Sequence, residues 1–488
     1  MSVRSHTSER HQRSRKPGVK FRARSNKTIM GFFKKITIIG AVLTLISAVA
    51  IGVICLRSLP APSLPEQYWG PGEPKADKTV IVPFKINISD HIIDDLNDRL
   101  ELLPPLTPPL ENANFRYGFN SDYLQKVVQI WLKEYKWRER EAFLNKFPQF
   151  KTQVAGLNIH FIHVKPSKVP EGVRVLPLLL LHGWPGSVRE FYDLIPLLTT
   201  PREHEKFVFE VVAPSLPGYG FSDGASKKGL GAAQMAVVLK SLMERIGFKK
   251  FYVQGGDWGS IIGSDMSILF PNSVLGYHSN MCFVNSPLAT VKQIISSIWP
   301  SLFIDEDKIS NFRSFGERLM YLLEETGYMH LQSTKPDTIG VALRDSPAGL
   351  ASYILEKFST WTDREWRSLA DGGLTKKYKL INLLDNIMIY WVTGSITTSL
   401  RLYSETFNKA QFSLGIDRAQ CTVPTACALF PNEIDYQHEF ILKDKYVNLI
   451  QVTEMPRGGH FAAFEEPELL ADDIWEAVYK MRLPPKGK

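Results

Sequence analysis

Phe251-Tyr-Val-Gln-Gly-Gly-Asp-Trp-Gly-Ser260 is the stretch that decides the fold of this 488-residue chain. Its β-prone first residues run directly into Asp257, and the residues from Ser260 onward are compatible with a helix. Gly255 and Gly259 stand two residues before and after Asp257, as in the sharp strand-to-helix turn that exposes a nucleophile, where a flanking Cβ would clash. Aspartate occupies the position that usually carries serine, which favours attack on an sp³ carbon through an alkyl-ester intermediate.

Strand and helix patterns alternate on both sides of this turn. Strands are predicted at 159–164, 176–181, 207–213, 251–254, 425–430 and 447–452, with helical segments between them such as 231–246. The continuous apolar run at 176–181 is typical of a central parallel strand. Strand alternating with helix predicts an α/β fold with a mostly parallel sheet.

The pattern predicts six segments along the chain. They are a basic tail at 1–35, a transmembrane anchor at 36–56, a spacer and helical strap at 57–150, the first part of the α/β core at 151–290, a helical cap at 291–412 and the second part of the core at 413–488. In the strap, one amphipathic helix begins at Asp90 and stops before Pro104, and a second follows Ser121. The aromatic-rich cap is expected to cover the carboxyl ends of the strands, where α/β sites form.

The net charge of +8 is not spread over the chain. The first 35 residues hold eleven Lys and Arg against the single acid Glu9, which leaves 47 basic and 49 acidic residues in the remainder. The globular part is therefore not basic, and this distribution argues against a nucleic-acid partner.

The segment 36–56 contains no charged residue across 21 positions. As a helix it would be about 31 Å long, enough to cross a bilayer core. A cleaved signal peptide with a small-residue site at 48–50 is the alternative, but the apolar run is long for one and the basic lead is extended. The excess of Lys and Arg before the segment predicts a cytoplasmic amino terminus and a lumenal remainder.

An acid and a histidine follow Asp257 in the chain order of an α/β-hydrolase triad. The acid position follows a predicted strand, where Glu433 and Asp435 both occur, and Glu433 is favoured. His460 stands in a glycine-rich loop. An aspartate nucleophile is already ionised at neutral pH, so His460 is needed to deprotonate the water that attacks the ester, while Glu433 orients the imidazole and stabilises its charged form.

A second loop, His182-Gly-Trp-Pro-Gly-Ser187, directly follows the apolar strand. It can present a backbone N–H to pair with that of Trp258, so that two donors face the charge that develops beside Asp257. His182 is expected to order this loop rather than to transfer protons. Hydroxyl donors from the cap would complete a site that opens epoxides, because the leaving alkoxide is poor without a hydrogen bond.

These motifs resemble those of the microsomal epoxide hydrolase family, which includes the juvenile hormone epoxide hydrolases of insects. The resemblance extends from Tyr68 to about Trp475. It rests on Trp69-Gly-Pro-Gly72, Tyr117-Gly-Phe-Asn120, His160-Phe-Ile-His-Val164, His182-Gly-Trp-Pro-Gly-Ser187, Pro217-Gly-Tyr-Gly-Phe-Ser222, Gly255-Gly-Asp-Trp-Gly-Ser260, Ser352-Tyr-Ile-Leu-Glu-Lys-Phe-Ser-Thr-Trp361 and Arg457-Gly-Gly-His-Phe-Ala-Ala-Phe-Glu-Glu-Pro467.

The resemblance implies an α/β-hydrolase fold and a complete set of site residues. Asp257 would be the nucleophile, His460 the base, Glu433 its charge partner, Tyr328 and Tyr403 the donors to the epoxide oxygen, and Trp184 and Trp258 the sources of the oxyanion amides. A lipophilic epoxide and water are the implied substrates, without cofactor or metal, at the endoplasmic reticulum membrane. The family's anchor usually holds the catalytic domain on the cytosolic face, opposite to the charge bias here, so the orientation stays open, as does the choice between a xenobiotic and a hormone epoxide.

Two other functions fit parts of the pattern. An alkyl-halide hydrolase shares the aspartyl ester but needs N–H donors for halide in place of cap hydroxyls. A hormone- or lipid-binding protein without turnover would be expected to have lost Asp257, Glu433 or His460, and all three are present. Cys55, Cys282, Cys421 and Cys427 follow neither a CxxC nor a zinc spacing, so free thiols are predicted.

Overall fold

The computed structural model describes residues 57–306 and 312–483, together with seven isolated positions between 34 and 52. The chain forms two compact units, Met1–Arg57 and Ser58–Lys488. The predicted basic tail and most of the predicted anchor at 36–56 lie outside the described residues. Among the residues that are described, no helix is long and apolar enough to cross a bilayer.

In the described part of the chain, nine strands form one sheet in the order β1-β2-β3-β5-β4-β6-β7-β8-β9. They are β1 (Val82–Phe84), β2 (Gln149–Val154), β3 (Leu157–Val164), β4 (Arg174–Leu181), β5 (Phe207–Pro214), β6 (Phe251–Gly255), β7 (Val274–Ser279), β8 (Thr425–Leu429) and β9 (Leu449–Glu454). Strands β4 to β9 pair in parallel, and β1, β2 and β3 add an antiparallel edge beside β5. The mostly parallel sheet is confirmed.

The six predicted strands are present, with ends that differ by one or two residues. Strands β1, β2 and β7 were not predicted. Strand β1 has only three residues and includes Pro83, and β2 (Gln149–Val154) carries four polar side chains and only two apolar ones. Because β1 pairs with β2, the predicted strap begins with a strand and is not helical throughout.

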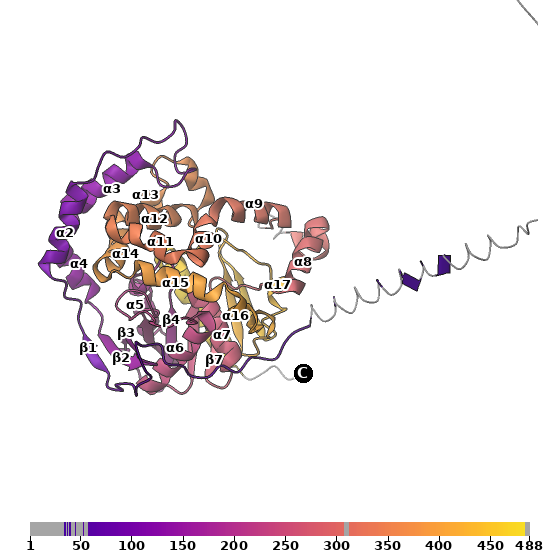
Figure 1. Ribbon diagram of the computed structural model, residues 1–488. Helices are drawn as coiled ribbons and strands as arrows, with labels where there is room; N and C mark the ends of the chain where they lie inside the picture. The colour runs from indigo at the N-terminus through magenta and orange to yellow at the C-terminus, as the bar shows by residue number, and fades with distance from the viewer. Residues whose placement is uncertain are drawn as a thin grey trace, which may run out of the picture. The chain divides into compact units, whose positions relative to one another are not determined.

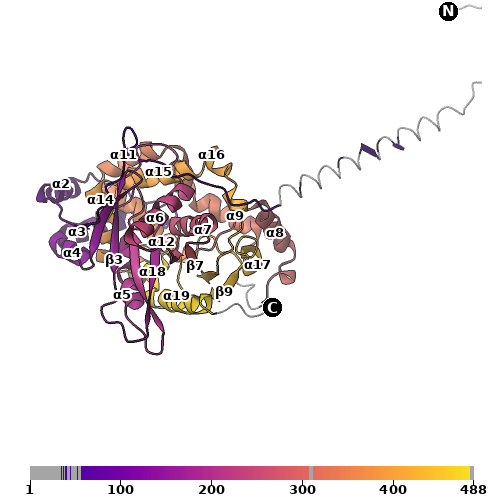
Figure 2. The same cartoon turned by 90° about the horizontal axis from the view of Figure 1, so that it is seen from below.

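Helices cover both faces of the sheet, as Figures 1 and 2 show. Helices α6 (Ala232–Ile246) and α7 (Trp258–Leu269) lie on one face, and α5 (Leu194–Thr199) and α19 (Pro467–Met481) lie on the other. The central strand β4 is buried at its carboxyl end, where Leu178 to Leu181 expose 1% or less of their surface. This layering leaves the carboxyl ends of the strands as the open edge of the sheet.

A long helical insertion between β7 and β8 lies over that edge (Figure 1). Its α-helices are α8 (Pro287–Ile298), α9 (Phe315–Glu325), α10 (Gly327–Thr334), α11 (Pro336–Asp345), α12 (Pro347–Thr360), α13 (Leu374–Lys377), α14 (Leu380–Thr393), α15 (Ile396–Thr406) and α16 (Lys409–Phe412). Helix α14 is almost completely buried, from Leu383 to Val392. The insertion therefore packs as part of the same core as the sheet.

The strap contains α2 (Asp90–Glu101), α3 (Ser121–Lys133) and α4 (Trp137–Leu144), of which the first two were predicted. It is held to the helical insertion through the fully buried carboxylate of Asp385 on α14. Asp385 accepts hydrogen bonds from Tyr135 Oη (3.0 Å) and Arg140 Nε (2.8 Å) of the strap region, and from Arg189 Nε (2.9 Å) of the loop after β4. These charged partners offset the cost of burying the carboxylate.

The prediction of free thiols is wrong for two cysteines, because Cys282 and Cys427 form a disulfide. They are 145 residues apart in sequence but lie at neighbouring strands, with Cα atoms 5.8 Å apart. Only the pairing of β7 with β8 brings them together, so their spacing carried no signal. Cys421 is a buried free thiol, and Cys55 lies outside the described residues.

Candidate active site

The turn between β6 and α7 holds Asp257 in a conformation that side chains rarely adopt, with φ of 49° and ψ of −128°. A Cβ on Gly255 would overlap the backbone of Gly259, and a Cβ on Gly259 would overlap the carbonyl group of Leu181. Both positions must therefore be glycine, as predicted. The strained turn lifts the carboxylate of Asp257 out of the sheet edge.

The structure brings Glu433 and His460 to Asp257 from the loops after β8 and β9. His460 Nδ1 lies 2.7 Å from Glu433 Oε1, and His460 Nε2 lies 3.3 Å from Asp257 Oδ2. The backbone N–H of His460 donates to the carbonyl oxygen of Trp361 (2.9 Å), which fixes the histidine loop against the helical insertion. This arrangement suits a histidine that donates Nδ1–H to a carboxylate and works through Nε2.

Asp435, the other acid considered for this position, points elsewhere. Its two carboxylate oxygens bind Arg318 of α9 at 2.6 and 2.8 Å, in a bidentate ion pair. The structure therefore places Glu433, and not Asp435, on the imidazole.

The three groups are coupled electrostatically. Burial alone would lower the pKa of His460, but the adjacent carboxylates of Glu433 and Asp257 outweigh it and hold the pKa well above its usual range. The imidazolium form is thus favoured as long as Asp257 carries its negative charge. Loss of the Asp257 charge removes one of the two carboxylates that raise the pKa of His460.

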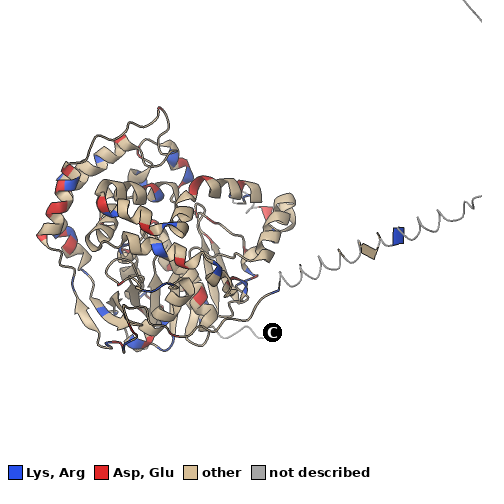
Figure 3. Ribbon diagram, in the orientation of Figure 1, with Lys and Arg blue, Asp and Glu red and all other residues tan. Residues whose placement is uncertain are grey.

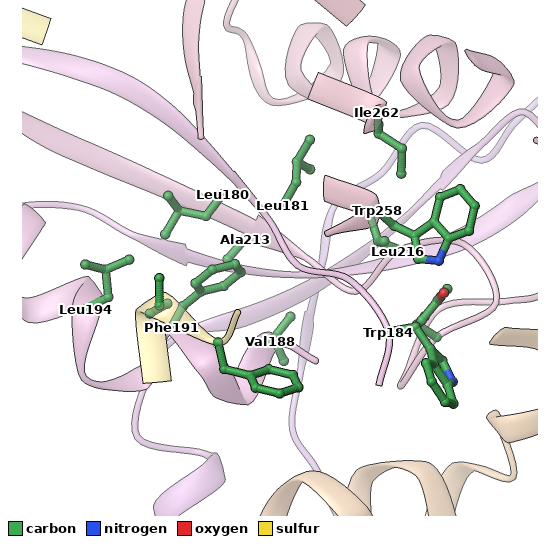
Figure 4. Packing of buried hydrophobic residues seen from close by; sticks show 14 of the residues in the cluster. Leu180, Leu181, Trp184, Val188, Phe191, Leu194, Ala213, Leu216, Trp258 and Ile262 are labelled. Carbon is green, nitrogen blue, oxygen red and sulfur yellow. The ribbon is translucent and has the colours of Figure 1, made fainter. Parts of the chain in front are cut away.

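A backbone amide from the loop after β4 also contacts Asp257. The N–H of Trp184 donates to Asp257 Oδ1 at 2.6 Å. Gly183 precedes it, where any Cβ would overlap the Asp257 side chain. Trp258 is the first residue of α7, and N–H groups in a first helical turn have no acceptor within the helix. Figure 4 shows both indoles at the same end of the buried cluster, away from Leu180 and Leu194.

The predicted tyrosines come from two helices of the insertion, Tyr328 from α10 and Tyr403 from α15. The Tyr328 ring stacks on Trp184 with a centroid distance of 5.2 Å and an angle of 9°. The Tyr403 ring meets Trp258 edge-on at 4.7 Å, and the two tyrosine rings are 5.8 Å apart. Burial holds the pKa of both phenols well above the usual value, so both stay protonated and able to donate.

Two neighbouring residues behave as supports. His182 Nε2 accepts the backbone N–H of Leu216 at 3.1 Å, and burial lowers the pKa of His182 to about 4, so it is neutral and orders the loop as predicted. Trp361 packs edge-on against His460 at 5.0 Å and forms part of the wall of the site. In the part of the chain that the structure describes, no cluster of three or more His, Cys, Asp or Glu is placed to hold a metal ion.

Sequence reasoning missed Glu190, which lies in the short helical turn Val188–Tyr192 after the loop of His182. Its side chain lines a small cavity together with Asp257, Asn280 and His460. Nothing in Val-Arg-Glu-Phe marks which side chain turns inward. The sequence showed only that Glu190 lies about one helical turn after the loop that begins at His182.

The sheet order, the strained turn and the ordered triad define an α/β-hydrolase. The family described as "alpha/beta hydrolase fold" matches residues 177–422, and that described as "Epoxide hydrolase N terminus" matches residues 81–191. The chain is 57% identical over 427 residues to "Juvenile hormone epoxide hydrolase 1" of Ctenocephalides felis, covering 87% of this chain and 92% of that protein. It is 49% identical over 429 residues to "Epoxide hydrolase 1" of Oryctolagus cuniculus, covering 86% and 93%.

Among solved structures, the juvenile hormone epoxide hydrolase of the silkworm Bombyx mori superposes with a TM-score of 0.84 at 49% identity, over 86% of this chain and 98% of that one. The chain therefore belongs to the microsomal epoxide hydrolase family, and it is an enzyme that hydrolyses epoxides. The resemblance in the motifs is confirmed.

The two acids after β8 give a matched pair of variants. Glu433→Gln should lower kcat by about 10²- to 10⁴-fold, because the amide cannot stabilise the imidazolium that forms in the reaction. Asp435→Asn removes the charge that is paired with Arg318 and changes no contact of His460, so it should retain most of the turnover. Initial rates with a lipophilic epoxide, at equal secondary structure by circular dichroism, measure the difference. Equal losses in both variants would show that the geometry at His460 does not control the rate.

Proposed function

We propose that this enzyme opens lipophilic epoxides by attack of Asp257 on a ring carbon and then hydrolyses the resulting ester with His460 and Glu433. One observation carries the proposal. The Asp257 carboxylate accepts the Trp184 N–H at one oxygen and lies 3.3 Å from His460 Nε2 at the other, while Glu433 occupies the second nitrogen of the imidazole.

In the first step, Asp257 Oδ2 bonds to an epoxide carbon and the ring C–O bond breaks. The oxygen that leaves the ring gains negative charge, and the hydroxyls of Tyr328 and Tyr403 are proposed to hydrogen-bond to it. One of them gives its proton to the alkoxide and recovers a proton from solvent. The raised pKa of both phenols supports this role, because it keeps both donors protonated over the physiological range.

In the second step, His460 takes a proton from a water molecule whose oxygen bonds to Cγ of Asp257. Esterification has already removed the charge of Asp257, which lowers the pKa of His460 relative to the resting enzyme. The imidazolium then releases its proton to solvent, and the neutral imidazole can act as a base. Negative charge then forms on Oδ1, where the N–H groups of Trp184 and Trp258 are proposed to stabilise it.

The intermediate collapses by breaking the Cγ–Oδ2 bond. The departing alkoxide takes the proton from the imidazolium of His460, and the regenerated carboxyl group of Asp257 loses its proton to solvent. The products are a vicinal diol and the resting enzyme. The recharged Asp257 raises the pKa of His460 again, and the imidazole regains from solvent the proton that it released. Over both steps one epoxide and one water are consumed, and the proton taken from solvent by the tyrosine is returned by Asp257.

For the substrate, we propose an epoxide of the juvenile hormone type. Relatives named juvenile hormone epoxide hydrolase occur at 57% and 54% identity in Ctenocephalides felis and at 47% in Bombyx mori. A lipophilic substrate also fits the aromatic wall formed by Trp184, Tyr328, Trp361 and Tyr403. Breakdown of xenobiotic epoxides is the second candidate, because relatives named "Epoxide hydrolase 1" match at 49% identity.

We propose that residues 36–56 anchor the enzyme in the endoplasmic reticulum membrane with the catalytic unit in the lumen. The uncharged run of 21 residues and the basic lead before it support the anchor and its direction. The Cys282–Cys427 disulfide supports the same direction, since disulfides persist in oxidising compartments such as the lumen.

The mechanism predicts that the His460→Gln variant accumulates the ester. Mixed with a lipophilic epoxide, it should gain the whole mass of the epoxide on the peptide that contains Asp257, because hydrolysis is disabled while alkylation is not. Intact-protein and peptide mass spectrometry measure the adduct.

The Tyr328→Phe, Tyr403→Phe double variant in the same background is the control and should form no adduct, since the ring is not opened. Diol formation by the wild type without any adduct on Asp257 in the His460→Gln variant would remove Asp257 as the nucleophile. Full activity of the double variant would remove the tyrosines from the mechanism.

The proposed orientation predicts that Asn87 is glycosylated in microsomes. Asn87 begins the sequon Asn-Ile-Ser and is exposed just before α2, so it is accessible in the lumen. A glycosidase-sensitive mass shift that disappears in Asn87→Gln is the expected result. An unmodified Asn87, with the catalytic unit cut by protease added outside sealed microsomes, would reverse the orientation.

A further inference from the structure

A dense apolar surface covers α8, α9 and the short helical turn Pro300–Leu302 that follows α8. This α8–α9 apolar surface is formed by Ile294, Ile298, Trp299, Leu302, Met320 and Leu323, whose exposed fractions run from 42% to 73%. Of the 25 large apolar side chains exposed in the described residues, ten fall within 291–323. Such clustering differs from the scattered apolar residues of an ordinary surface and indicates an interaction site. Figure 3 shows α8 mostly in tan, with little charge.

Helix α8 has the reverse arrangement of a surface helix that faces water, because polar residues are buried and large apolar residues are exposed. Its buried residues are Ala289, Gln293 and Ser296, and its outer face carries Ile294 and Ile298. The inner polar groups are satisfied, because the Gln293 amide donates to a backbone carbonyl (3.2 Å) and the Ser296 hydroxyl donates to the carbonyl of Gln293 (3.1 Å). A helix that packs its polar side inward and its apolar side outward fits an apolar surrounding.

This surface lies on the side where the chain enters the folded unit. The N–H of Leu59 donates to the carbonyl of Arg418 (2.9 Å). Three residues after Arg418, the N–H of Cys421 donates to the carbonyl of Lys445 (2.7 Å). The neighbouring Asp444 is ion-paired with Lys292 of α8. The uncharged segment proposed as the anchor ends two residues before Ser58. Leu59, near the start of the catalytic unit, and the α8–α9 apolar surface therefore lie on the same side of that unit.

We propose that the α8–α9 apolar surface docks on the lipid bilayer in which the anchor is held. Trp299 would lie at the level of the headgroups, with Ile298 and Leu302 at the acyl boundary. The inference rests on the proposed anchor for the choice of lipid over another protein. Helix α10 begins two residues after α9 and carries Tyr328, so the docked bilayer lies next to a helix of the active site.

Site-specific fluorescence on the full-length enzyme in phospholipid vesicles tests the docking. In a Cys55→Ser background, a nitrobenzoxadiazole probe is attached at Ile298→Cys, and the matched control carries it at Val82→Cys. Val82 is also exposed and apolar, but it lies on β1 at the far edge of the sheet from β8 and β9. The probe at position 298 should shift to the blue and lose fluorescence when brominated phospholipid replaces the ordinary lipid, while the probe at position 82 stays unchanged.

If the probe at position 298 stays in water while the enzyme is bound to vesicles, the docking of the α8–α9 apolar surface is wrong and the proposed anchor is unaffected. A blue shift that depends on protein density and is not quenched by brominated lipid indicates a second copy of the chain and also overturns it. Failure of the enzyme to float with vesicles at all would instead contradict the anchor.

A second, independent observation concerns the cavity behind Asp257. Glu190, Asp257, Asn280 and His460 line it, and the volume open to the centre of a water molecule is about 10 Å³, close to what one water needs. A carboxyl oxygen of Glu190 occupies the place that a Cβ on Gly186 would take, so the absence of a side chain there lets the carboxyl turn inward. Burial raises the pKa of Glu190 to about 8, which leaves it uncharged beside the Asp257 carboxylate at neutral pH.

We infer that Glu190 is a catalytic residue that binds the hydrolytic water in this cavity. The water gives one hydrogen to His460 Nε2 in the second step and donates the other to a carboxyl oxygen of Glu190, which leaves a lone pair of the water oxygen directed at Cγ of Asp257. This inference rests on the proposed two-step mechanism and adds no further proton or electron to it.

Rapid-quench kinetics with intact-protein mass spectrometry test the role, because they separate ester formation from ester hydrolysis. In Glu190→Met or Glu190→Leu, the ester should form at a rate close to that of the wild type, and hydrolysis should slow by about 10- to 100-fold for loss of the hydrogen bond to the water. Glu190→Gln keeps a carbonyl acceptor and should stay close to the wild type.

A variant that forms the ester has a folded site. The rate of ester hydrolysis in either apolar variant that forms the ester therefore decides whether Glu190 has this role. Equal slowing of both steps, or unchanged hydrolysis, overturns the role of Glu190. Absence of the ester in the wild type and in every variant contradicts the proposed mechanism instead.

Discussion

The positive φ of Asp257 is the constraint on which the active site depends. A strand that ends in this turn and passes at once into α7 leaves one side chain at the carboxyl edge of the sheet, within reach of the loops that follow β4 and β9. The turn is possible because Gly255 and Gly259 allow the strand, the helix and the end of β4 to approach more closely than a Cβ permits. The strain is held by the buried sheet around it.

Charge coupling then determines how the three catalytic groups can work in sequence. With Asp257 ionised, His460 is held as an imidazolium between two carboxylates, and this stabilises the carboxylate of Asp257 without removing its charge. Esterification neutralises Asp257 and leaves Glu433 as the remaining carboxylate on the imidazole. In the proposed mechanism the same histidine then loses its proton and changes from a counter-ion to a base, as a consequence of the first chemical step.

The helical insertion completes the site by bringing aromatic groups over the strand ends. Trp184 from the core stacks on Tyr328 and meets Tyr403, so the oxyanion loop and the two phenols form one packed layer. Asp385 holds this layer to the strap and the core through Arg140 and Arg189. An apolar, water-poor site strengthens each hydrogen bond made to developing charge. The outward apolar face of α8 belongs to the same insertion.

Local sequence was enough for the turn at Asp257, the six main strands and the order of nucleophile, acid and histidine, because each depends on residues near one another in the chain. Tertiary structure alone separated Glu433 from Asp435, paired Cys282 with Cys427, added the short edge strand β1 and turned Glu190 toward Asp257. Backbone propensity and glycine sterics act over a few residues and are visible in sequence. The direction of a side chain and the partner it finds depend on elements that are distant in the chain, and only folding brings these together.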